Sequence, residues 1–423
     1  MEEYKKRVRK YIQTHQAKGI QLLKQLVQEK SVSGEESRAQ AIVIEKMRQL
    51  GLQLDIWEPS FKEMEHHSYF VSPRKDFHDS PNVVAALKGT GGGKSMILNG
   101  HIDVVPEGDV SQWDYDPYSG EVVGGRLYGR GATDMKGGNV ALMMAIEAII
   151  ACEIRLKGDI YFQSVIEEES GGAGTLAAIL RGYKADGAII PEPTSLKFFP
   201  KQQGSMWFRL TIKGKAAHGG TRYEGVSAIE KSMIVIEYLQ RLEKHRNERI
   251  DDPLYKSISI PIPINIGNIQ GGSWPSSVPD FLTLEGRYGV APNETLEEAK
   301  REFESWLSEI EKVDSWFTHH PVGIEWFGAR WVPGALEEQH ILIESLQENF
   351  TYVRGEAPII EASPWGTDGG LFTSIVNIPT IIFGPGETKV AHYPNEYIDL
   401  NQMVSAAEIF ACMLLDWCEV SEE

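Results

Sequence analysis

A histidine and an acid close one of the most apolar runs in the chain. His101 and Asp103 end the run 95–103, which is typical of a buried strand. With a side-chain period of two, both residues point to the same face of that strand. Asp103 could then hold one imidazole nitrogen while the other binds a metal ion. Taken alone, the spacing fits a plain hydrogen-bonded His–Asp pair better than a metal site.

A second acid stands in a glycine-rich turn. Asp134 lies within the segment 128–138, directly before an apolar helix expected over 138–151. An Asp at that place can bind a metal ion, or it can simply cap the helix. The spacing of the glycines fits neither the P-loop nor the dinucleotide-binding fingerprint.

Further acids follow two other expected strands. Three consecutive carboxylates at 167–169 come after a buried strand, where their mutual repulsion calls for a cation or a raised pKa. Because neighbouring residues alternate in direction, one acid can bind a metal ion while the next faces a water molecule. Glu192 lies between two prolines, which make its backbone rigid. A structural turn explains that acid as well.

His392, in a loop near the C-terminus, completes a set of histidines and acids without cysteine. Such a set suits Zn²⁺, Co²⁺ or Mn²⁺. A carboxylate that bridges two such ions holds them about 3.5–4 Å apart, and the pair lowers the pKa of bound water toward about 7. A nearby glutamate that is not a ligand can then take the proton.

The composition excludes other classes of function. The 423 residues include 42 Lys and Arg against 60 Asp and Glu, which gives a formal charge of −18. A surface this acidic repels phosphate backbones and anionic lipids, so we expect neither nucleic-acid nor membrane partners. Three cysteines provide no disulfide framework, and no apolar stretch is typical of a signal peptide or a membrane span. We therefore expect a cytoplasmic protein.

The order of elements predicts an α/β protein with an insertion. Strands alternate with helices in 1–203 and again in 329–423, as in a sheet covered on both faces. Residues 204–328 follow the order β-α-β-β-α-β of a small open-faced sandwich. In α/β sheets, ligands collect beyond the carboxyl ends of the strands, and the acids and His101 stand at such ends.

Six short motifs, in this order, resemble the acetylornithine deacetylase / succinyl-diaminopimelate desuccinylase family of two-zinc amidohydrolases, relatives of aminoacylases and dipeptidases. The likeness covers nearly the whole chain, and the combined signal is highly specific. The motifs are His101-x-Asp103, Gly131-x-x-Asp134-Met135-Lys136-Gly137-Gly138, Glu168-Glu169-x-Gly171-Gly172, Glu192-Pro193-Thr194, Ala217-His218-Gly219 and His392-x-Pro394-x-Glu396.

The resemblance implies a role for each matching residue. Asp134 would bridge two metal ions, His101 and Glu192 would complete one site, and Glu169 and His392 would complete the other. Glu168 would be the general base that activates water and then protonates the leaving amine. Asp103 would orient His101, and His218 would stabilise the oxyanion, from its own subunit or from the partner in a homodimer. The inserted domain would then be a lid and dimerisation surface on a mixed-sheet catalytic domain.

The substrate is less sharply indicated. The resemblance suggests Arg287, Gly366 and Thr367 as substrate-binding residues. Family members that act on acidic acyl groups often carry Arg where this chain has Gly370, which argues against a succinyl substrate. Members often carry Asn where this chain has Ser276. Four tryptophans near the expected cleft would suit a flat aromatic amine; they are Trp274, Trp326, Trp331 and Trp365.

We therefore expect a two-metal hydrolase that cleaves the amide bond of a small N-acyl amine. Both an acetylornithine-type deacetylase and an N-formylaminopyrimidine deformylase of thiamine salvage fit this description. A dipeptidase or carboxypeptidase, or a succinyl-diaminopimelate desuccinylase, is the alternative, and a peptidase would use Arg287 to bind a free carboxylate. A non-catalytic binding protein of this fold is disfavoured because no expected ligand, nor Glu168, is missing.

Overall fold

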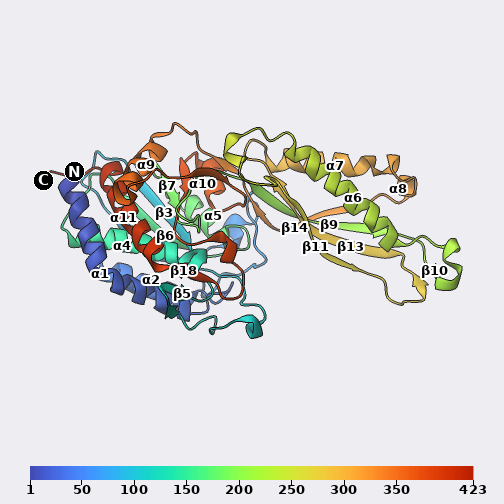
Figure 1. The fold of residues 1–423 in the computed structure, drawn as a ribbon, viewed down its shortest axis with the longest axis horizontal. Coiled ribbons are helices and arrows are strands. Elements are labelled where there is room, and N and C mark those ends of the chain that lie inside the picture. The colour runs from blue at the N-terminus through green and yellow to red at the C-terminus, as the bar shows by residue number, and fades with distance from the viewer. Residues whose placement is uncertain (423) are drawn as a thin grey trace. The chain divides into compact units, whose positions relative to one another are not determined.

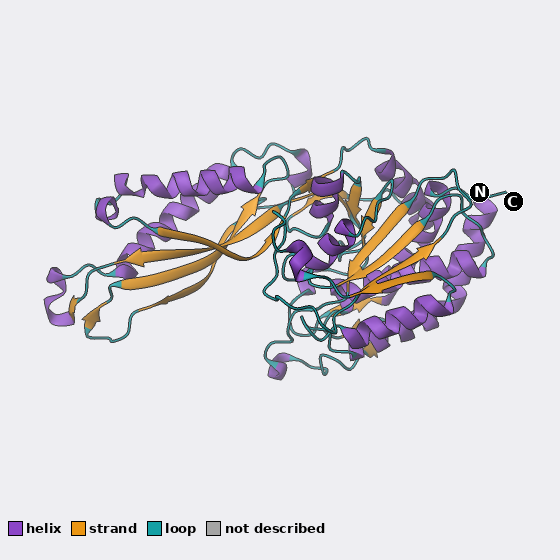
Figure 2. Cartoon of the chain, turned by 180° about the vertical axis from the view of Figure 1, so that it is seen from behind, coloured by secondary structure: helices purple, strands orange, loops and turns teal. Residues whose placement is uncertain are grey.

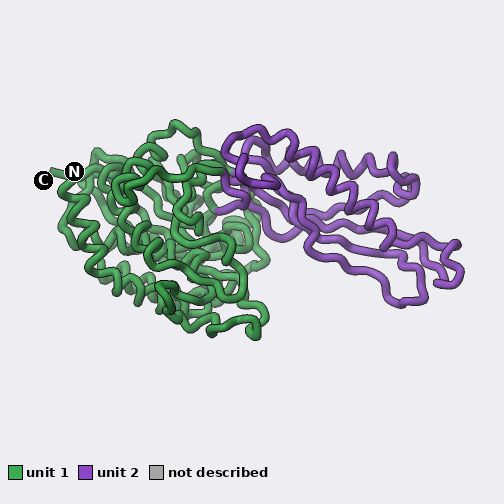
Figure 3. The backbone as a smooth tube through the Cα atoms, in the orientation of Figure 1, with its two compact units in different colours: residues 1–201, 334–361, 368–423 green, residues 202–333, 362–367 purple. Residues whose placement is uncertain are grey.

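The computed structural model describes residues 1–422, which form two compact units (Figure 3). Unit 1 consists of residues 1–201, 334–361 and the described residues from 368 onward, and unit 2 of residues 202–333 and 362–367. The insertion expected at 204–328 lies within unit 2, which also takes in residues on either side of it. Among the described residues, no helix combines the length and apolar character needed to cross a membrane.

A nine-stranded sheet forms the centre of unit 1 (Figure 2). Its strands run in the order β1-β2-β6-β3-β7-β17-β8-β15, and β16 pairs with β8. The pairs β3–β6, β3–β7 and β7–β17 are parallel, whereas β1–β2, β2–β6 and β8–β17 are antiparallel, which confirms the predicted mixed sheet. The strands are β1(Gln53–Trp57), β2(Asn82–Leu87), β3(Met96–His101), β6(Ile160–Val165), β7(Ala188–Ile190), β8(Phe198–Gln202), β15(Gly334–Ala335), β16(Ile360–Ser363) and β17(Thr380–Ile382).

Helices pack on both faces of this sheet. In β3, Asn99 donates a hydrogen bond to Thr175 of α5 at 2.9 Å, whereas the neighbouring Gly100 faces Asn139 of α4. Because adjacent strand residues point to opposite faces, α4 and α5 lie on opposite sides of β3. The helices of unit 1 are α1(Glu2–Gln28), α2(Ser37–Gln49), α3(Phe61–Met64), α4(Gly137–Ala151), α5(Ala173–Leu180), α9(Ile341–Arg354), α10(Gly369–Val376) and α11(Leu400–Trp417).

Helix α4 is buried along nearly its whole length. It contacts β3 on one side, and α1 and α11 pack against it on the other (Figure 1). This sandwiched position explains why its sequence is apolar all round instead of amphipathic. The turn that precedes α4 is thereby held firmly at the edge of the sheet.

A small sheet ties two loops of unit 1 together. Its strands are β4(Glu121–Val123), β5(Arg126–Tyr128) and β18(Tyr397–Asp399), in the order β18-β5-β4. Tyr397 pairs with Tyr128 in an antiparallel ladder. The chain that follows His392 is therefore held beside the chain that leads to Asp134.

Unit 2 has the predicted order β-α-β-β-α-β. Its four main strands form an antiparallel sheet in the order β11-β13-β9-β14. In its aromatic core, the ring centroid of Phe303 lies 4.9 Å from that of Phe208 and 4.8 Å from that of Tyr288. A capping box between Thr295 and Glu298 starts α7. The elements are β9(Gly204–Lys213), β10(Ala217–His218), α6(Ala228–Asn247), β11(Ile264–Gly271), β12(Ser277–Val278), β13(Phe281–Val290), α7(Leu296–Ser308), α8(Trp316–His319) and β14(Gly323–Trp331).

Candidate metal centre

The five side chains predicted as metal ligands lie together in unit 1. Three of them stand at the carboxyl ends of the neighbouring strands β3, β6 and β7, whose parallel direction brings those ends to one edge of the sheet. The other two come from the turn before α4 and from the loop between β17 and β18. In this order the side chains are His101, Glu169, Glu192, Asp134 and His392.

The two oxygens of Asp134 face different histidines. Oδ1 lies 3.3 Å from Nε2 of His101, and Oδ2 lies 3.2 Å from Nε2 of His392. Glu192 Oε1 lies 3.9 Å from the same nitrogen of His101, and Glu169 Oε1 lies 3.1 Å from that of His392. The donors therefore form two groups that share one carboxylate, which is the arrangement that a bridging ligand of two cations needs.

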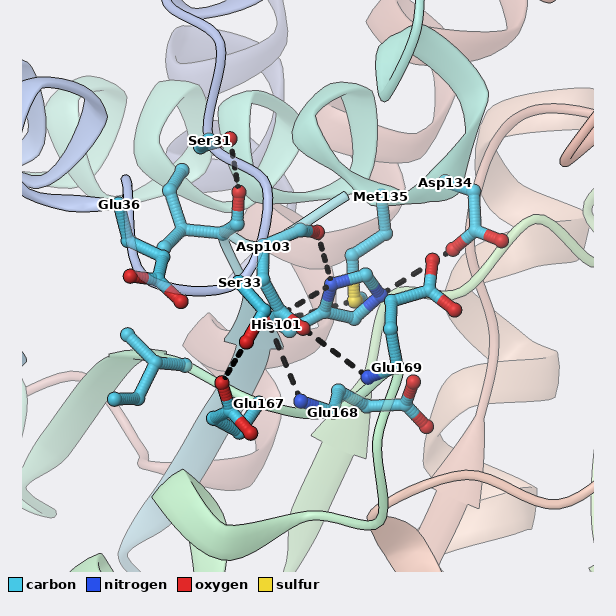
Figure 4. A network of polar contacts seen from close by, with 12 residues as sticks. Ser31, Ser33, Glu36, His101, Asp103, Asp134, Met135, Glu167, Glu168 and Glu169 are labelled. Atoms are coloured by element: carbon cyan, nitrogen blue, oxygen red, sulfur yellow. Dashed lines mark hydrogen bonds and ion pairs between the residues drawn. The ribbon is translucent and has the colours of Figure 1, made fainter. Parts of the chain in front are cut away.

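Glu168 lies within reach of the first group. One donor atom each from His101, Glu168 and Glu192 lie within 4.8 Å of one another. The same holds for donor atoms of His101, Asp134 and Glu169, which Figure 4 shows together with Glu168. The side chain of Glu168 is almost fully buried, with 6 % of its surface exposed. A buried carboxylate thus stands beside the five predicted ligands.

The charges of these groups fit bound cations. Burial, reinforced by Asp134, raises the pKa of Glu192 well above its usual range, and burial does the same for Glu168. Burial opposes the charged form of His392, but Glu169 and Asp134 raise its pKa to about 11. The acids outnumber the histidines, so positive charge from divalent ions would relieve their repulsion. Nitrogen and oxygen donors without sulfur suit zinc, cobalt or manganese.

Asp103 contacts His101 through its main chain. His101 Nδ1 lies 2.8 Å from the carbonyl oxygen of Asp103 and 3.6 Å from its carboxylate oxygen Oδ1. A proton on Nδ1, donated to that carbonyl, leaves Nε2 free to accept a metal ion. The Asp103 carboxylate instead accepts the main-chain N–H groups of Glu168 and Glu169, at 3.2 and 3.1 Å (Figure 4). One residue therefore holds both a histidine and the loop with the neighbouring acids.

The first of the three consecutive acids points away from the site. Glu167 has a left-handed backbone (φ 61°) and is fully buried. Its carboxylate accepts hydrogen bonds from Ser33, from Ser72 at 2.9 Å and from Ser170 at 2.6 Å, and it pairs with Arg74 at 3.2 Å. These partners compensate the charge of Glu167, whereas Glu169 still helps to raise the pKa of the neighbouring Glu168. No motif marked Ser33 or Arg74, and only packing brings them here.

The glycine-rich motif packs the start of α4 against two strand ends. Asn139 donates to the carbonyl oxygen of His101 at 2.7 Å, and a Cβ at Gly138 would lie 2.0 Å from the carbonyl oxygen of Pro191. Lys136, also buried, donates to the carbonyl oxygens of Leu26 and Glu29 at the end of α1. The motif therefore fixes Asp134 relative to both His101 and Glu192.

The other predicted site residues belong to unit 2. His218 is exposed, and its Nδ1 accepts the main-chain N–H of Gly220 at 3.1 Å. Arg287 Nη1 lies 3.5 Å from Gln203 Oε1, and burial lowers the Arg287 pKa to about 10. Thr367 donates to Gln202 Oε1 at 2.6 Å, and a Cβ at Gly366 would lie 2.6 Å from Cβ of Trp331. The catalytic and substrate-binding roles of these residues stay predictions.

Comparisons with known proteins extend over most of the chain. The family described as Peptidase family M20/M25/M40 matches residues 97–416. The chain is 33 % identical over 405 residues to the N-formyl-4-amino-5-aminomethyl-2-methylpyrimidine deformylase of Halalkalibacterium halodurans, and the match covers 90 % of this chain and 89 % of that one. The deformylase of the same name from Bacillus subtilis is 31 % identical, with 98 % of both chains covered.

Solved structures share the fold. The di-peptidase Dug1p of Saccharomyces cerevisiae superposes with a TM-score of 0.76 at 16 % identity and full coverage of both chains. Human carnosine dipeptidase 1 superposes with a TM-score of 0.73 at 19 % identity, covering 98 % of this chain and all of that one. These two likenesses confirm the fold. The family match and the sequence relatives confirm the family resemblance and the prediction of an enzyme that hydrolyses amides. The chain belongs to peptidase family M20/M25/M40.

Proposed function

We propose that this enzyme hydrolyses the amide bond of a small N-acyl amine, and that an N-formylaminopyrimidine is its substrate. The observation that carries the proposal is the shared carboxylate of Asp134, with His101 on one side and His392 on the other. The substrate follows from the two relatives named as deformylases, at 33 % and 31 % identity. Relatives named as probable succinyl-diaminopimelate desuccinylase reach 28 % identity and cover 78 % of this chain.

The ligands divide between two metal positions in this proposal. His101 and Glu192 would hold one ion, Glu169 and His392 would hold the other, and Asp134 would serve both. Zinc is the ion we expect, and cobalt or manganese suits the same nitrogen and oxygen donors. Two divalent ions bound here would polarise the substrate carbonyl and lower the pKa of the attacking water.

Glu168 is the proposed general base. Its main-chain N–H is held by Asp103 Oδ1 at 3.2 Å, and its carboxylate lies near His101 and Glu192. It takes a proton from the attacking water and gives the proton to the leaving amine. Proton transfer by a positioned side chain contributes about 10²–10⁴-fold to the rate of such reactions.

Unit 2 supplies the substrate-binding residues and the dimer surface in this proposal. Arg287, Gly366 and Thr367 are the substrate-binding residues, of which Arg287 would contribute binding energy only to a substrate that carries a carboxylate. His218 stabilises the oxyanion within its own subunit or across a homodimer. Several large apolar side chains of unit 2 are exposed, which supports a partner surface there; examples are Tyr223 at 80 %, Trp274 at 69 % and Met233 at 66 %. We also place the enzyme in the cytoplasm, and the free state of its three cysteines supports a reducing compartment.

A peptidase is the second candidate, and Arg287 is the observation that favours it. A half-buried guanidinium 3.5 Å from the amide oxygen of Gln203 could bind the free carboxylate of a peptide. A formylaminopyrimidine has no such carboxylate. Arg287→Ala should therefore abolish activity on dipeptides but preserve activity on the formylated amine.

A substrate panel tests the proposal. The zinc-loaded protein is assayed against N-formylaminopyrimidine, N-acetylornithine, N-succinyl-diaminopimelate and simple dipeptides. We expect kcat/KM to be highest for the formyl compound. Turnover of the succinyl compound alone would refute both this substrate and the argument from Gly370, and turnover of dipeptides alone would favour the second candidate.

A further inference from the structure

Glu396 is a fully buried carboxylate that contacts the turn carrying Asp134. Its Oε1 accepts the main-chain N–H groups of Thr133 and Asp134, at 3.0 and 3.2 Å. Its Oε2 accepts a hydrogen bond from Nη1 of Arg130 at 2.6 Å, and the Arg130 side chain is itself 2 % exposed. One buried carboxylate therefore takes three hydrogen bonds from a single segment of five residues, 130–134.

The main chain of Glu396 contacts the same segment. Its carbonyl oxygen accepts the N–H of Gly129 at 2.9 Å, and the next residue, Tyr397, begins the pairing of β18 with β5. Glu396 follows His392 by four residues in the loop that leads to β18. Side chain and main chain together join the loop that carries His392 to the turn that carries Asp134.

Stability is a poor explanation for this buried pair. The free energy lost when two charges are desolvated can equal the free energy gained from their attraction. Proteins in which apolar residues of similar volume replace such a buried pair are often equally stable. Geometry explains the pair better, because the two N–H groups held by Glu396 lie at Asp134 and at the residue before it. A shift of that peptide would move both oxygens of Asp134 relative to His101 and His392 at once.

We propose that Glu396 is a positioning residue, which fixes the Asp134 turn relative to the His392 loop so that two metal ions bind together. This inference rests on the proposed metal centre. Arg130 completes the arrangement because its charge pairs with that of Glu396. The arginine is itself held in place, since its Nη2 donates to the carbonyl oxygen of Pro106 at 3.3 Å. The inference assigns a role to Glu396, the last residue of the motif His392-x-Pro394-x-Glu396, to which the family resemblance gives no role as a ligand.

The variant Glu396→Gln tests this role. The oxygen of the introduced amide can accept from either the two main-chain N–H groups or Arg130. In each case the NH₂ group of the amide faces the remaining donor, which it cannot accept. Glu294→Gln is the matched control, because Glu294 accepts hydrogen bonds from the buried Arg246 and from the N–H of Ala291 in unit 2. Each variant removes one carboxylate charge beside a buried arginine.

The measurement is a titration of the full-length, metal-depleted protein with Co²⁺, followed by visible absorption. Wild type and Glu294→Gln should each bind two equivalents of Co²⁺, and the affinities of the control variant should equal those of wild type. Glu396→Gln should bind the second equivalent about 10- to 100-fold more weakly. In chelator, the melting temperature of both variants should lie below that of wild type. On addition of Co²⁺, only Glu396→Gln should show a smaller rise in melting temperature than wild type.

Three results would count against the inference or its basis. Uptake of two equivalents by Glu396→Gln with wild-type affinity overturns the positioning role. Failure of wild type to bind two equivalents overturns the proposed metal centre instead. Should Glu396→Gln not fold, the double variant Arg130→Gln/Glu396→Gln replaces it. In the double variant, the oxygen of the amide at position 396 can accept both main-chain N–H groups. Its NH₂ group can then donate to the oxygen of the amide at position 130. Regained two-equivalent binding supports the role, and weak binding by the folded double variant overturns it.

Discussion

The carboxylate of Asp103 accepts a hydrogen bond from the main-chain N–H of Glu168, with 3.2 Å between Oδ1 and the nitrogen. The second oxygen, Oδ2, accepts the N–H of Glu169 at 3.1 Å. The carboxylate is fully buried, with 1 % of the residue exposed. Both oxygens of this one acid therefore fix the loop that presents the proposed base and a proposed ligand.

Asp103→Asn should impair catalysis through this loop. An asparagine offers one oxygen, so its NH₂ group would face one of the two N–H donors. We expect kcat to fall about 10- to 100-fold, as for other groups that orient metal ligands. Asp109→Asn is the control, because Asp109 also accepts a main-chain N–H, from Ser111 at 3.0 Å, but at an exposed turn. Steady-state kinetics with equal kcat for Asp103→Asn and wild type would contradict the expectation.

Glu168→Gln should separate metal binding from turnover. The amide keeps the size of the side chain but cannot take a proton, so kcat should fall by about 10²–10⁴-fold. Metal content, measured by mass spectrometry of the purified protein, should equal that of wild type. A fully active Glu168→Gln would refute the base assignment, and a metal-free one would place Glu168 among the ligands.

Removal of the metal ions should abolish activity and lower stability. Ions that bind only the folded state stabilise it by about 4 kcal/mol when their free concentration is a thousand times the dissociation constant. We expect chelator to lower the melting temperature and zinc to restore both stability and turnover. Asp134→Asn should show no such rise with zinc, because the shared carboxylate is lost. Identical melting curves of wild type with and without zinc would argue against the metal centre.

Gly138→Ala should destabilise the protein at the start of α4. The new Cβ would lie 2.0 Å from the carbonyl oxygen of Pro191, so the helix must move away from the strand end that carries Glu192. Overpacking of this kind costs about 1–3 kcal/mol in the free energy of unfolding. Gly267→Ala in β11, where the nearest atom lies at 3.5 Å, should unfold like wild type. Equal denaturation midpoints for Gly138→Ala and wild type would contradict this packing argument.

The sequence by itself determined the family, the mixed α/β architecture and the βαββαβ insertion. These features follow from local patterns, namely apolar runs of strand length, glycine-rich turns and motifs such as His101-x-Asp103. A side-chain period of two fixes the face on which His101 lies, and parallel strands bring their carboxyl ends to one edge. Residues as distant as Glu169 and Glu192 could therefore be predicted to meet at the site.

Only the tertiary structure decided which group contacts which. It turned Glu167 toward Ser33 and Arg74, placed the Asp103 carboxylate on the N–H groups of Glu168 and Glu169, and set Glu396 against the Asp134 turn. Spacing along the chain fixes the direction of a side chain relative to its own element. Hydrogen bonds act over about 3 Å, and a partner at that distance depends on how remote segments pack.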